Sequence, residues 1–243
     1  GDTIVCVSQA VADNLRNLCR RGSAEVLVIH NGFDSDDFDS VKPADVREKL
    51  GIPKDSVLVS LVGRINAWKG HWLLLDAVKS MRHRDRVDVL MVGDVYGTQT
   101  HFRDRLETDI AASGMANRIH LLGFRTDARE ILAASDIAVV PSTEPDSLPT
   151  VVLEAMALRL PVIGTRVGGI PAIIEDSVTG YTVEPIPVDL AERLDELVES
   201  ADLRRDMGVA GRARFDAMFG IKRFRDDIEE VLRRRYLGKG EGA

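Results

Sequence analysis

Short apolar runs alternate with helical patterns along most of the chain. The runs are rich in Val, Ile and Leu, as expected of strands that are buried on both faces of a parallel sheet. They lie at 57–62, 87–92, 119–122, 137–140, 161–163 and 180–183. Helix is predicted between them at about 69–81, 99–113, 127–134, 149–159 and 170–175. This order predicts a doubly wound, Rossmann-like α/β domain whose ligands bind beyond the carboxyl ends of the strands.

The two ends of the chain follow a different pattern. A strand is predicted at 3–7, a helix capped by Ser8 runs to about residue 20, a second strand lies at 26–29, and a turn-rich segment covers 31–37. Two strands and one helix cannot bury themselves, so we expect them to belong to a second α/β domain. Further helices are predicted at 187–200, 202–217 and 221–236, and the tail at 238–243 has a disordered composition.

These patterns predict three parts. Residues 1–40 would be the end of a neighbouring domain with a crossing segment, 41–220 a ligand-binding domain, and 221–243 a crossing helix with a flexible tail. The first residues lack an initiator Met and the features of a signal peptide, so we expect the sequence to begin inside a longer protein.

Composition excludes several classes of protein. With 44% hydrophobic and 29% charged residues among 243, and no long apolar run, the chain reads as an ordinary globular one. The net charge of −7 disfavours binding to nucleic acid. Cys6 and Cys19 form no CxxC pair, which indicates a reducing compartment, and we expect a cytoplasmic protein. The five histidines are scattered, so no metal site is predicted.

The first candidate site follows the strand at 57–62. Gly63 allows a ligand to approach the backbone, and Arg64 and Lys69 place two cations at the start of the next helix. A diphosphate is the natural ligand of such a loop. The alternative is a loop whose Arg and Lys face solvent.

The second candidate site follows the strand at 137–140. Ser147 and Pro149 are expected to start a helix whose positive end faces the crevice, which favours an anion there. Glu154 lies among apolar neighbours in this helix, where a carboxylate needs a hydrogen-bonding partner such as paired ligand hydroxyls. The alternatives are that protein groups satisfy Glu154 and that Asp146, in the preceding loop, only caps a turn.

Together with further motifs, these segments resemble the GT-B-fold family 4 of retaining glycosyltransferases. The motifs are the G-R-x4-K-G loop at 63–70, the D-x7-E-A-M-A helix at 146–157, Asn31-Gly32-Phe33-Asp34, Pro161-Val162-Ile163-Gly164-Thr165 and Gly168-Gly169-Ile170-Pro171. The resemblance covers about residues 1–236. It implies a donor domain that binds a UDP-, GDP- or ADP-sugar and transfers a hexose with retention of configuration, without a metal or other cofactor. A sugar, lipid or small-molecule acceptor would bind through the other domain, so we expect this chain alone to be inactive.

The resemblance also implies roles for individual residues. Arg64 and Lys69 would bind the diphosphate and stabilise the negative charge of the leaving group. Glu154 would accept hydrogen bonds from the ribose, and Asp146 would contact the donor sugar. The backbone around the sugar and phosphate would come from Ser147, Leu148, Pro149 and Thr150, and that around the base from Gly123, Phe124 and Arg125.

Two residues depart from the family pattern. Asp146 stands where Glu is usual and is one methylene shorter, and Pro149 stands where the family often has Gly and cannot donate a backbone hydrogen bond. The identity of the donor sugar therefore stays open. So do two other functions: a module that binds a nucleotide sugar without transferring it, and an epimerase or phosphorylase on the same fold.

Two further features have structural explanations. Trp68 and Trp72 are spaced like neighbours on a helix and are expected to pack in the core or at a domain interface. The basic residues at 233–235 suit the cationic end of a helix, although contact with an anionic membrane surface stays open for the full protein.

Overall fold

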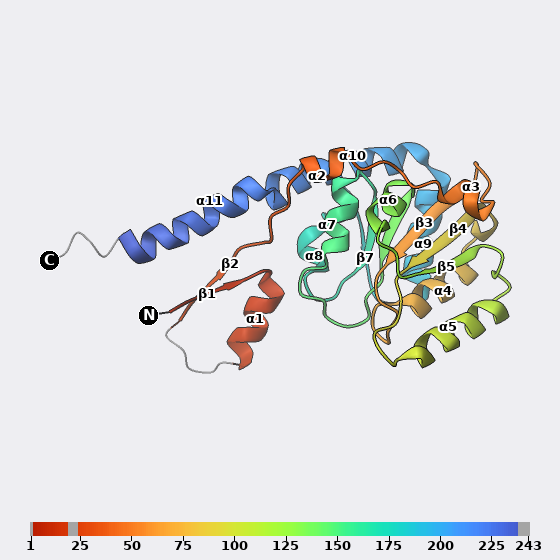
Figure 1. The fold of residues 1–243 in the computed structure, drawn as a ribbon, viewed down its shortest axis with the longest axis horizontal. Helices are drawn as coiled ribbons and strands as arrows, with labels where there is room; N and C mark the ends of the chain where they lie inside the picture. The colour runs from red at the N-terminus through yellow and green to blue at the C-terminus, as the bar shows by residue number, and fades with distance from the viewer. Residues whose placement is uncertain (1, 19–23, 238–243) are drawn as a thin grey trace.

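A six-stranded parallel sheet forms the centre of the computed structural model, which describes residues 2–18 and 24–237 (Figure 1). In space the strands lie in the order β5-β4-β3-β6-β7-β8, and every neighbouring pair is parallel. Their bounds are β3 (Val57–Val62), β4 (Val87–Val92), β5 (Ile119–Gly123), β6 (Ile137–Val140), β7 (Val162–Thr165) and β8 (Gly180–Val183). The predicted doubly wound α/β fold is confirmed.

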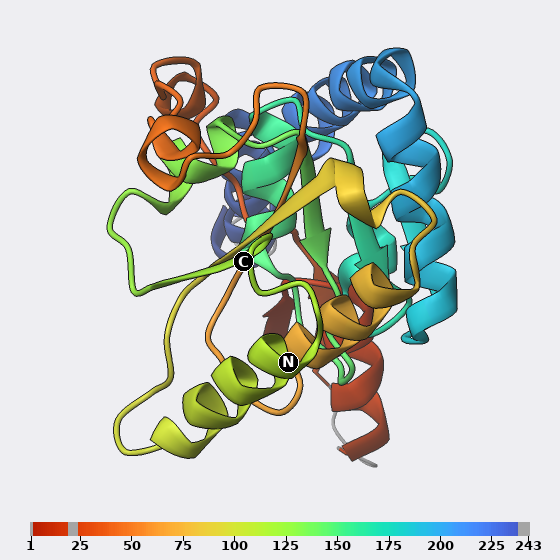
Figure 2. The same cartoon turned by 90° about the vertical axis from the view of Figure 1, so that its right-hand side faces the viewer.

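Helices cover both faces of this sheet (Figures 1 and 2). Side chains on a strand alternate between the two faces, so Val59 and Leu61 join one apolar cluster while Leu58 joins another. The first face is covered by α4 (His71–Ser80), α5 (Thr100–Ala112) and α9 (Pro187–Glu199). The other face is covered by α3 (Val46–Leu50), α6 (Ala128–Ala133), α7 (Thr150–Ala157), α8 (Ile170–Ile173) and α10 (Ala201–Phe219).

The direction of winding reverses between β3 and β6. The chain passes from β3 to β4 and β5 on one side, and later returns to β6, β7 and β8 on the other side. The connections after β3 and β6 therefore diverge and leave a crevice at the carboxyl ends of these strands. This is where an open α/β sheet binds its ligands.

A small separate sheet lies at the N-terminal end of the chain. Strands β1 (Thr3–Cys6) and β2 (Glu25–Val28) pair in parallel around α1 (Gln9–Leu18). The predicted cap of α1 is confirmed, since the Ser8 hydroxyl accepts a hydrogen bond from the Val11 amide at 3.3 Å. The predicted end of this helix near Arg20 and the predicted flexible tail lie outside the described residues.

Two crossing segments connect this small sheet to the main domain. The Phe33 amide donates to the carbonyl of Phe219 at 2.8 Å, and the Ile221 amide donates to the carbonyl of Phe33 at 2.8 Å. Beyond this contact α11 (Ile221–Leu232) runs along β1 and β2, where the Arg235 side chain contacts the Thr3 hydroxyl (Figure 1). The outgoing and returning segments are thus hydrogen-bonded to each other.

A buried arginine anchors the first crossing segment to the main domain. Arg212 of α10 donates to Asp39 at 2.7 Å and to the Ala157 carbonyl at 3.0 Å. The hydrogen bond from Arg212 holds the pKa of Asp39 below its usual value. Asp39 ends α2 (Asp36–Asp39), a short helix that overlaps the end of the segment predicted to be rich in turns.

Several predicted boundaries were wrong. Helix α7 (Thr150–Ala157) agrees closely with the predicted 149–159, but Ser147, which was also expected to start it, lies outside it, because Pro149 is extended and a residue before proline avoids helical angles. Regular helix in α11 ends at Leu232, followed by a π-helical turn at Arg233–Leu237. The short α3 and the 3-10 turn at Arg84–Arg86 were not predicted.

Within residues 2–18 and 24–237, the helices lack the length and apolar character of a membrane span.

Candidate functional site

The loops after β3 and β6 form the two walls of the crevice and contact each other. The Thr143 amide donates to the Trp68 carbonyl at 2.8 Å. Further out, the Lys69 Nζ lies 2.6 Å from the Asp146 Oδ2, and these side chains are only 20% and 14% exposed. This charge-assisted hydrogen bond joins the two walls. Because both side chains are largely buried, solvent and salt screen it little. The structure therefore brings together Lys69 and Asp146, which the sequence placed in separate motifs.

The position of Lys69 is set by its own loop. The Asn66 Oδ1 accepts hydrogen bonds from the amides of Trp68 at 3.1 Å and of Lys69 at 2.8 Å, which closes a tight turn. Gly70 follows in the left-handed conformation, with φ +78°, and α4 starts at the next residue. The Lys69 Nζ lies 4.6 Å from the centroid of the Trp68 ring. Asn66 was not predicted, although an Asn just before a tight turn is a recognisable sequence signal.

The two tryptophans of this region have different surroundings. Trp72 is half-buried, packs edge-on against Phe102, and donates from Nε1 to Asp109 at 2.8 Å, which confirms its predicted packing role. Trp68 instead lies at the crevice under the Lys69 ammonium. Its ring helps to hold this cation in place by a cation–π contact.

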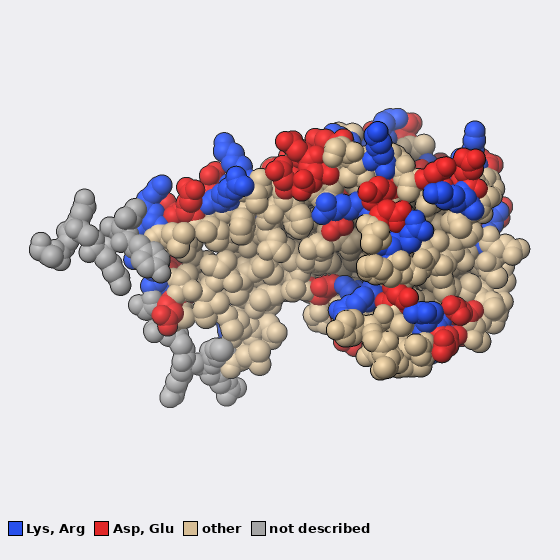
Figure 3. All heavy atoms as spheres, in the orientation of Figure 1, with Lys and Arg blue, Asp and Glu red and all other residues tan. Residues whose placement is uncertain are grey.

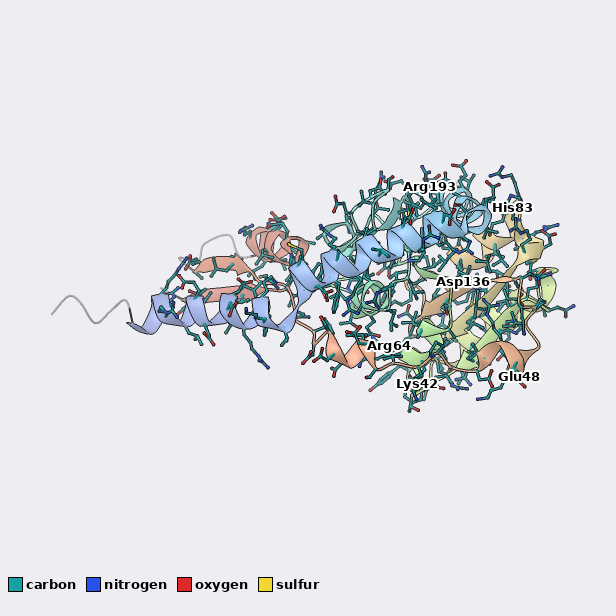
Figure 4. All side chains as sticks on the ribbon, turned by 90° about the horizontal axis from the view of Figure 1, so that it is seen from above. Lys42, Glu48, Arg64, His83, Asp136 and Arg193 are labelled. Atoms are coloured by element: carbon teal, nitrogen blue, oxygen red, sulfur yellow. The ribbon has the colours of Figure 1, made fainter. Side chains whose placement is uncertain are left out.

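Arg64 is the free cation of the crevice. Its side chain is exposed, and it makes no hydrogen bond or ion pair with any residue in 2–18 or 24–237; its guanidinium carbon lies 5.9 Å from the centroid of the Tyr96 ring. Figure 4 labels it on the opposite side of the molecule from Arg193 and His83. An arginine without a carboxylate partner is available to an anionic ligand.

A pocket of about 430 Å³ opens beside Arg64 at the ends of β3, β4 and β5. Its walls combine backbone, the exposed Tyr96 ring and the exposed Phe124 ring. A partly apolar pocket of this size, with two aromatic residues in its lining, suits an aromatic ring system. The lining residues are Val62, Gly63, Arg64, Val92, Gly93, Asp94, Val95, Tyr96, Phe124, Arg125 and Ala128.

Phe124 and Arg125 of the predicted segment line this pocket, and Gly123 precedes them. Gly123 ends β5 with φ +64°, and its carbonyl accepts from the Gly93 amide at 2.8 Å. The guanidinium of Arg125 forms an ion pair with Asp127, with a nitrogen–oxygen distance of 2.6 Å. The Arg125 side chain is thus held by a neighbour and is not free to pair with a ligand.

Gly93 is a structural requirement that the sequence did not indicate. Its φ is +134°, and a Cβ atom built on it would lie 2.1 Å from the Gly63 carbonyl oxygen. At Gly63, by contrast, the nearest atom to such a Cβ is the Lys69 Cδ at 3.8 Å. The absence of a side chain at Gly93 therefore allows the ends of β3 and β4 to approach closely, while the space beside Gly63 borders the Lys69 side chain.

The loop at 145–149 is held from behind by two glycines. The Gly169 amide donates to the Asp146 carbonyl at 2.6 Å, and a Cβ on Gly168 would lie 2.1 Å from the same oxygen. Leu148 and Pro149 are buried, so their side chains serve the core and not the crevice. Ser147 is exposed in the loop, and Thr150 is exposed at the start of α7, where the first backbone N–H groups of a helix have no partners inside it.

Glu154 lies one turn into α7 and is half-buried. It shares the less buried side of the helix with Thr150 and Val151, while Val152, Leu153 and Ala155 are in the core. Its carboxylate makes no hydrogen bond or ion pair with the described part of the chain. The alternative that protein donors satisfy Glu154 is therefore not supported, and the group is available to a ligand.

His71, the first residue of α4, is a buried polar residue next to the crevice. In the described part of the chain, neither of its ring nitrogens has a hydrogen-bond partner. Burial, and then the charge of Lys69, lower the pKa of His71 to about 4. The folded protein therefore holds this ring in its neutral form.

The His71 pKa makes the free energy of unfolding depend on pH. Below about pH 6.5 the unfolded chain protonates this ring, but the folded chain does so only near pH 4. Stability from this group should therefore fall by about 1.4 kcal/mol per pH unit as the pH drops through that window. In His71→Leu this part of the slope should disappear, as measured by urea unfolding at pH 7, 6 and 5. Equal slopes in the two proteins would contradict the assignment.

The described residues give no indication of a metal centre. Across 2–18 and 24–237, no three His, Cys, Asp or Glu side chains are grouped so that they could hold an ion. The predicted ligand-binding side chains of the crevice are two cations, Arg64 and Lys69, and two carboxylates, Asp146 and Glu154. Such a set suits an anion and hydroxyl groups.

Known proteins with similar sequences are glycosyltransferases. The model of the family "Glycosyl transferases group 1" matches residues 44–214. The chain is 34% identical over 231 residues to a D-inositol 3-phosphate glycosyltransferase of Geodermatophilus obscurus, covering 89% of this chain and 50% of that protein. A protein of the same name from Actinosynnema mirum is 30% identical over 220 residues, which cover 87% of this chain and 52% of that protein. The chain thus spans about half the length of the curated relatives it matches.

Solved structures show the same architecture. A glycosyltransferase from Rickettsia africae superposes with a TM-score of 0.87 at 27% identity, covering 96% of this chain and 63% of that one. HepE from Anabaena in complex with UDP superposes with a TM-score of 0.87 at 26% identity, covering 96% of this chain and 64% of that one. HepE has also been solved with UDP-glucose, at a TM-score of 0.86 and 26% identity, over 96% of this chain and 64% of that one. The fold is thus that of the GT-B glycosyltransferases.

Proposed function

The chain belongs to the group 1 family of glycosyl transferases, and from this premise we propose that its crevice binds a nucleoside diphosphate sugar as the donor. The observation that carries the proposal is the set of polar groups at the switch point between β3 and β6. Arg64 and Glu154 have no partner among the described residues, and Lys69 is held at 2.6 Å by an exchangeable carboxylate, Asp146. Two cations suit a diphosphate, and the carboxylates suit hydroxyl groups.

Each part of the donor has a place in this proposal. The diphosphate lies between Arg64 and Lys69, and the base occupies the pocket beside Gly123, Phe124 and Arg125. The ribose hydroxyls donate to Glu154. The donor is a UDP-, GDP- or ADP-sugar, and no metal or other cofactor takes part.

Donor binding requires Lys69 to change partners. In the structure its ammonium is hydrogen-bonded to Asp146, so a phosphate oxygen must compete with that carboxylate. Once the phosphate holds Lys69, Asp146 is free to accept hydrogen bonds from the sugar. A bare nucleoside diphosphate offers no such hydroxyls and leaves Asp146 as an unpaired anion near the phosphate, so a complete sugar nucleotide is favoured.

The reaction proposed for the whole protein is transfer of a hexose with retention of configuration, as in family 4. Arg64 and Lys69 stabilise the negative charge that develops on the departing diphosphate. Asp146 and Glu154 do not act as the acid and base of a glycosidase, because both serve to bind donor hydroxyls. The acceptor, a sugar, lipid or small molecule, binds largely through the neighbouring domain, and this chain by itself binds the donor without transferring it.

The role of Glu154 is tested with ribose and deoxyribose nucleotides. Calorimetric titration with UDP, GDP and ADP identifies the preferred base. Glu154→Gln should then bind that nucleotide about 10-fold more weakly, because two charge-assisted hydrogen bonds become neutral ones. It should also lose most of the difference in affinity between the nucleotide and its 2′-deoxy form.

The matched control is Glu192→Gln, which changes an exposed glutamate on the opposite face of the sheet and should bind like the wild type. The proposal fails if the folded wild-type chain binds none of the three nucleotides. It also fails for Glu154 if both glutamine variants bind equally well.

A further inference from the structure

A second cavity, of about 410 Å³, lies between the small N-terminal sheet and the main domain. Helix α1 forms one wall with Ala10, Val11 and Asn14, and the loop after β6 forms the other with Pro145, Asp146 and Ser147. Figure 3 shows the molecule hollowed on the side between these two parts. Asp146 belongs to this cavity and, through Lys69, to the diphosphate crevice, so the two spaces adjoin.

The polar groups of this cavity have unused hydrogen-bonding capacity. The Asp146 Oδ2 contacts Lys69, but neither its Oδ1 nor the Ser147 hydroxyl has a partner in the described part of the chain. On the opposite wall, the exposed Asn14 side chain makes no hydrogen bond to any residue in 2–18 or 24–237. The remaining surface is small and apolar, from Ala10, Val11 and Pro145. Polar groups on two facing walls with apolar surface between them suit a sugar ring, which carries hydroxyls at its edge and C–H groups on its faces.

We propose that Asn14 is a specificity-determining residue that hydrogen-bonds to the donor sugar from the side opposite Asp146. This inference rests on the proposed function, which places the diphosphate at Arg64 and Lys69. The sugar attached to that diphosphate then lies next to Asp146, at the mouth of this cavity. Asn14 is the one polar side chain that α1 contributes to its lining.

The chemistry of an amide complements that of the carboxylate across the cavity. An ionised Asp146 can only accept hydrogen bonds, whereas the Asn14 amide both donates and accepts. A hydroxyl that donates to Asp146 can therefore accept from the Asn14 nitrogen, or donate to its oxygen if it is turned the other way. Asn14 and Asp146 together therefore favour one orientation of the sugar hydroxyls. An epimer with the other orientation leaves one of these side chains or a hydroxyl without a hydrogen bond.

The test compares sugar nucleotides with the corresponding bare nucleotides. The probes are UDP-glucose, GDP-mannose and ADP-glucose, each titrated beside its own bare nucleoside diphosphate. The measured quantity is the ratio of the two affinities, which isolates the contribution of the sugar. Asn14→Ala should reduce this ratio about 5-fold for the preferred donor, the effect of one or two hydrogen bonds, and leave binding of the bare nucleotide unchanged.

Asn17→Ala is the matched control, since it removes an exposed asparagine from the same helix outside the cavity and should keep the wild-type ratio. An unchanged ratio in Asn14→Ala, or a wild-type ratio of one for all three donors, overturns the inference while nucleotide binding and the proposed function stand. Absence of binding by the bare nucleotides overturns the proposed function itself.

Discussion

The double substitution of Arg64 and Lys69 by alanine is expected to weaken binding of a nucleoside diphosphate by about three orders of magnitude. In the proposed complex each cation makes charge-assisted hydrogen bonds to phosphate oxygens, and such bonds contribute about 1.5–3 kcal/mol each. The single substitutions should each cost about 10- to 100-fold, and the effects should be measured by calorimetry with the preferred nucleotide. The corresponding nucleoside, which lacks phosphates, should bind all these variants alike.

Substitutions of Asp146, the ion-pair partner of Lys69, distinguish the loss of the Lys69 charge from a loss of structure. Lys69→Ala leaves Asp146 as a largely buried anion, whose side chain is 14% exposed, and this anion also repels the diphosphate. Asp146→Asn removes the competitor for Lys69, so we expect it to bind the bare diphosphate more tightly than the wild type does. The double variant Lys69→Ala with Asp146→Asn should recover part of the affinity lost in Lys69→Ala.

Removal of two cations elsewhere provides the charge control. Lys79 and Arg205 are exposed and pair only with acidic side chains on their own helices. Their double substitution by alanine changes the net charge as much as the crevice variant does, yet should leave the affinity within about twofold, because exposed charges far from the ligand are screened. Equal losses in the two double variants would show a nonspecific effect of charge and rule out a diphosphate site at Arg64 and Lys69.

The second large effect is expected for Gly70→Ala. A Cβ atom at this position would lie 1.8 Å from the Pro141 carbonyl oxygen, and the φ of +78° is unfavourable for any residue with a side chain. The loops after β3 and β6 would have to separate, at a cost of about 3 kcal/mol or more beyond the strain of the backbone conformation. Chemical denaturation should show this loss of stability, and nucleotide binding should weaken as well, since Lys69 precedes the displaced residue.

Gly114→Ala measures the backbone strain alone. Gly114 has nearly the same φ, +73°, but no atom lies within 4 Å of its expected Cβ. We expect it to cost about 1–2 kcal/mol, the ordinary cost of placing a side chain in the left-handed region. If Gly70→Ala and Gly114→Ala destabilised the protein equally, the close contact with Pro141 would not matter for stability.

Much of the architecture was predictable because it depends on local patterns. All six strands of the main sheet lie within one or two residues of the apolar runs, and a Val-rich run buried on both faces leaves few alternatives to a parallel sheet. The loops with unusual chemistry, at 63–70 and 145–150, were recognisable because each follows such a run directly. Their position at the carboxyl ends of parallel strands then follows from the fold class.

Some features were not predicted, for different reasons. Leu148 was predicted to offer its backbone to the donor, and the structure places its side chain in the core, because the loop is held back against Gly168 and Gly169. Trp68 was expected to pack in the core or at a domain interface, but it is only half-buried and lies beside the Lys69 ammonium, after the turn closed by Asn66. The position of Leu148 depends on residues distant in sequence, whereas that of Trp68 depends on a local turn.

By itself, then, the sequence determined the order of the elements, the parallel sheet, and which residues carry charge near its carboxyl edge. Only the tertiary structure decided the partners of those residues. Lys69 and Asp146 are 77 positions apart, and they meet because β3 and β6 are neighbours at the point where the winding reverses. Asn14 and Asp146 line one cavity because the small sheet lies beside the main domain, with the crossing segments hydrogen-bonded to each other at Phe33 and Ile221. Strand order and the angle between two lobes arise from the burial of whole faces, which no short stretch of sequence encodes.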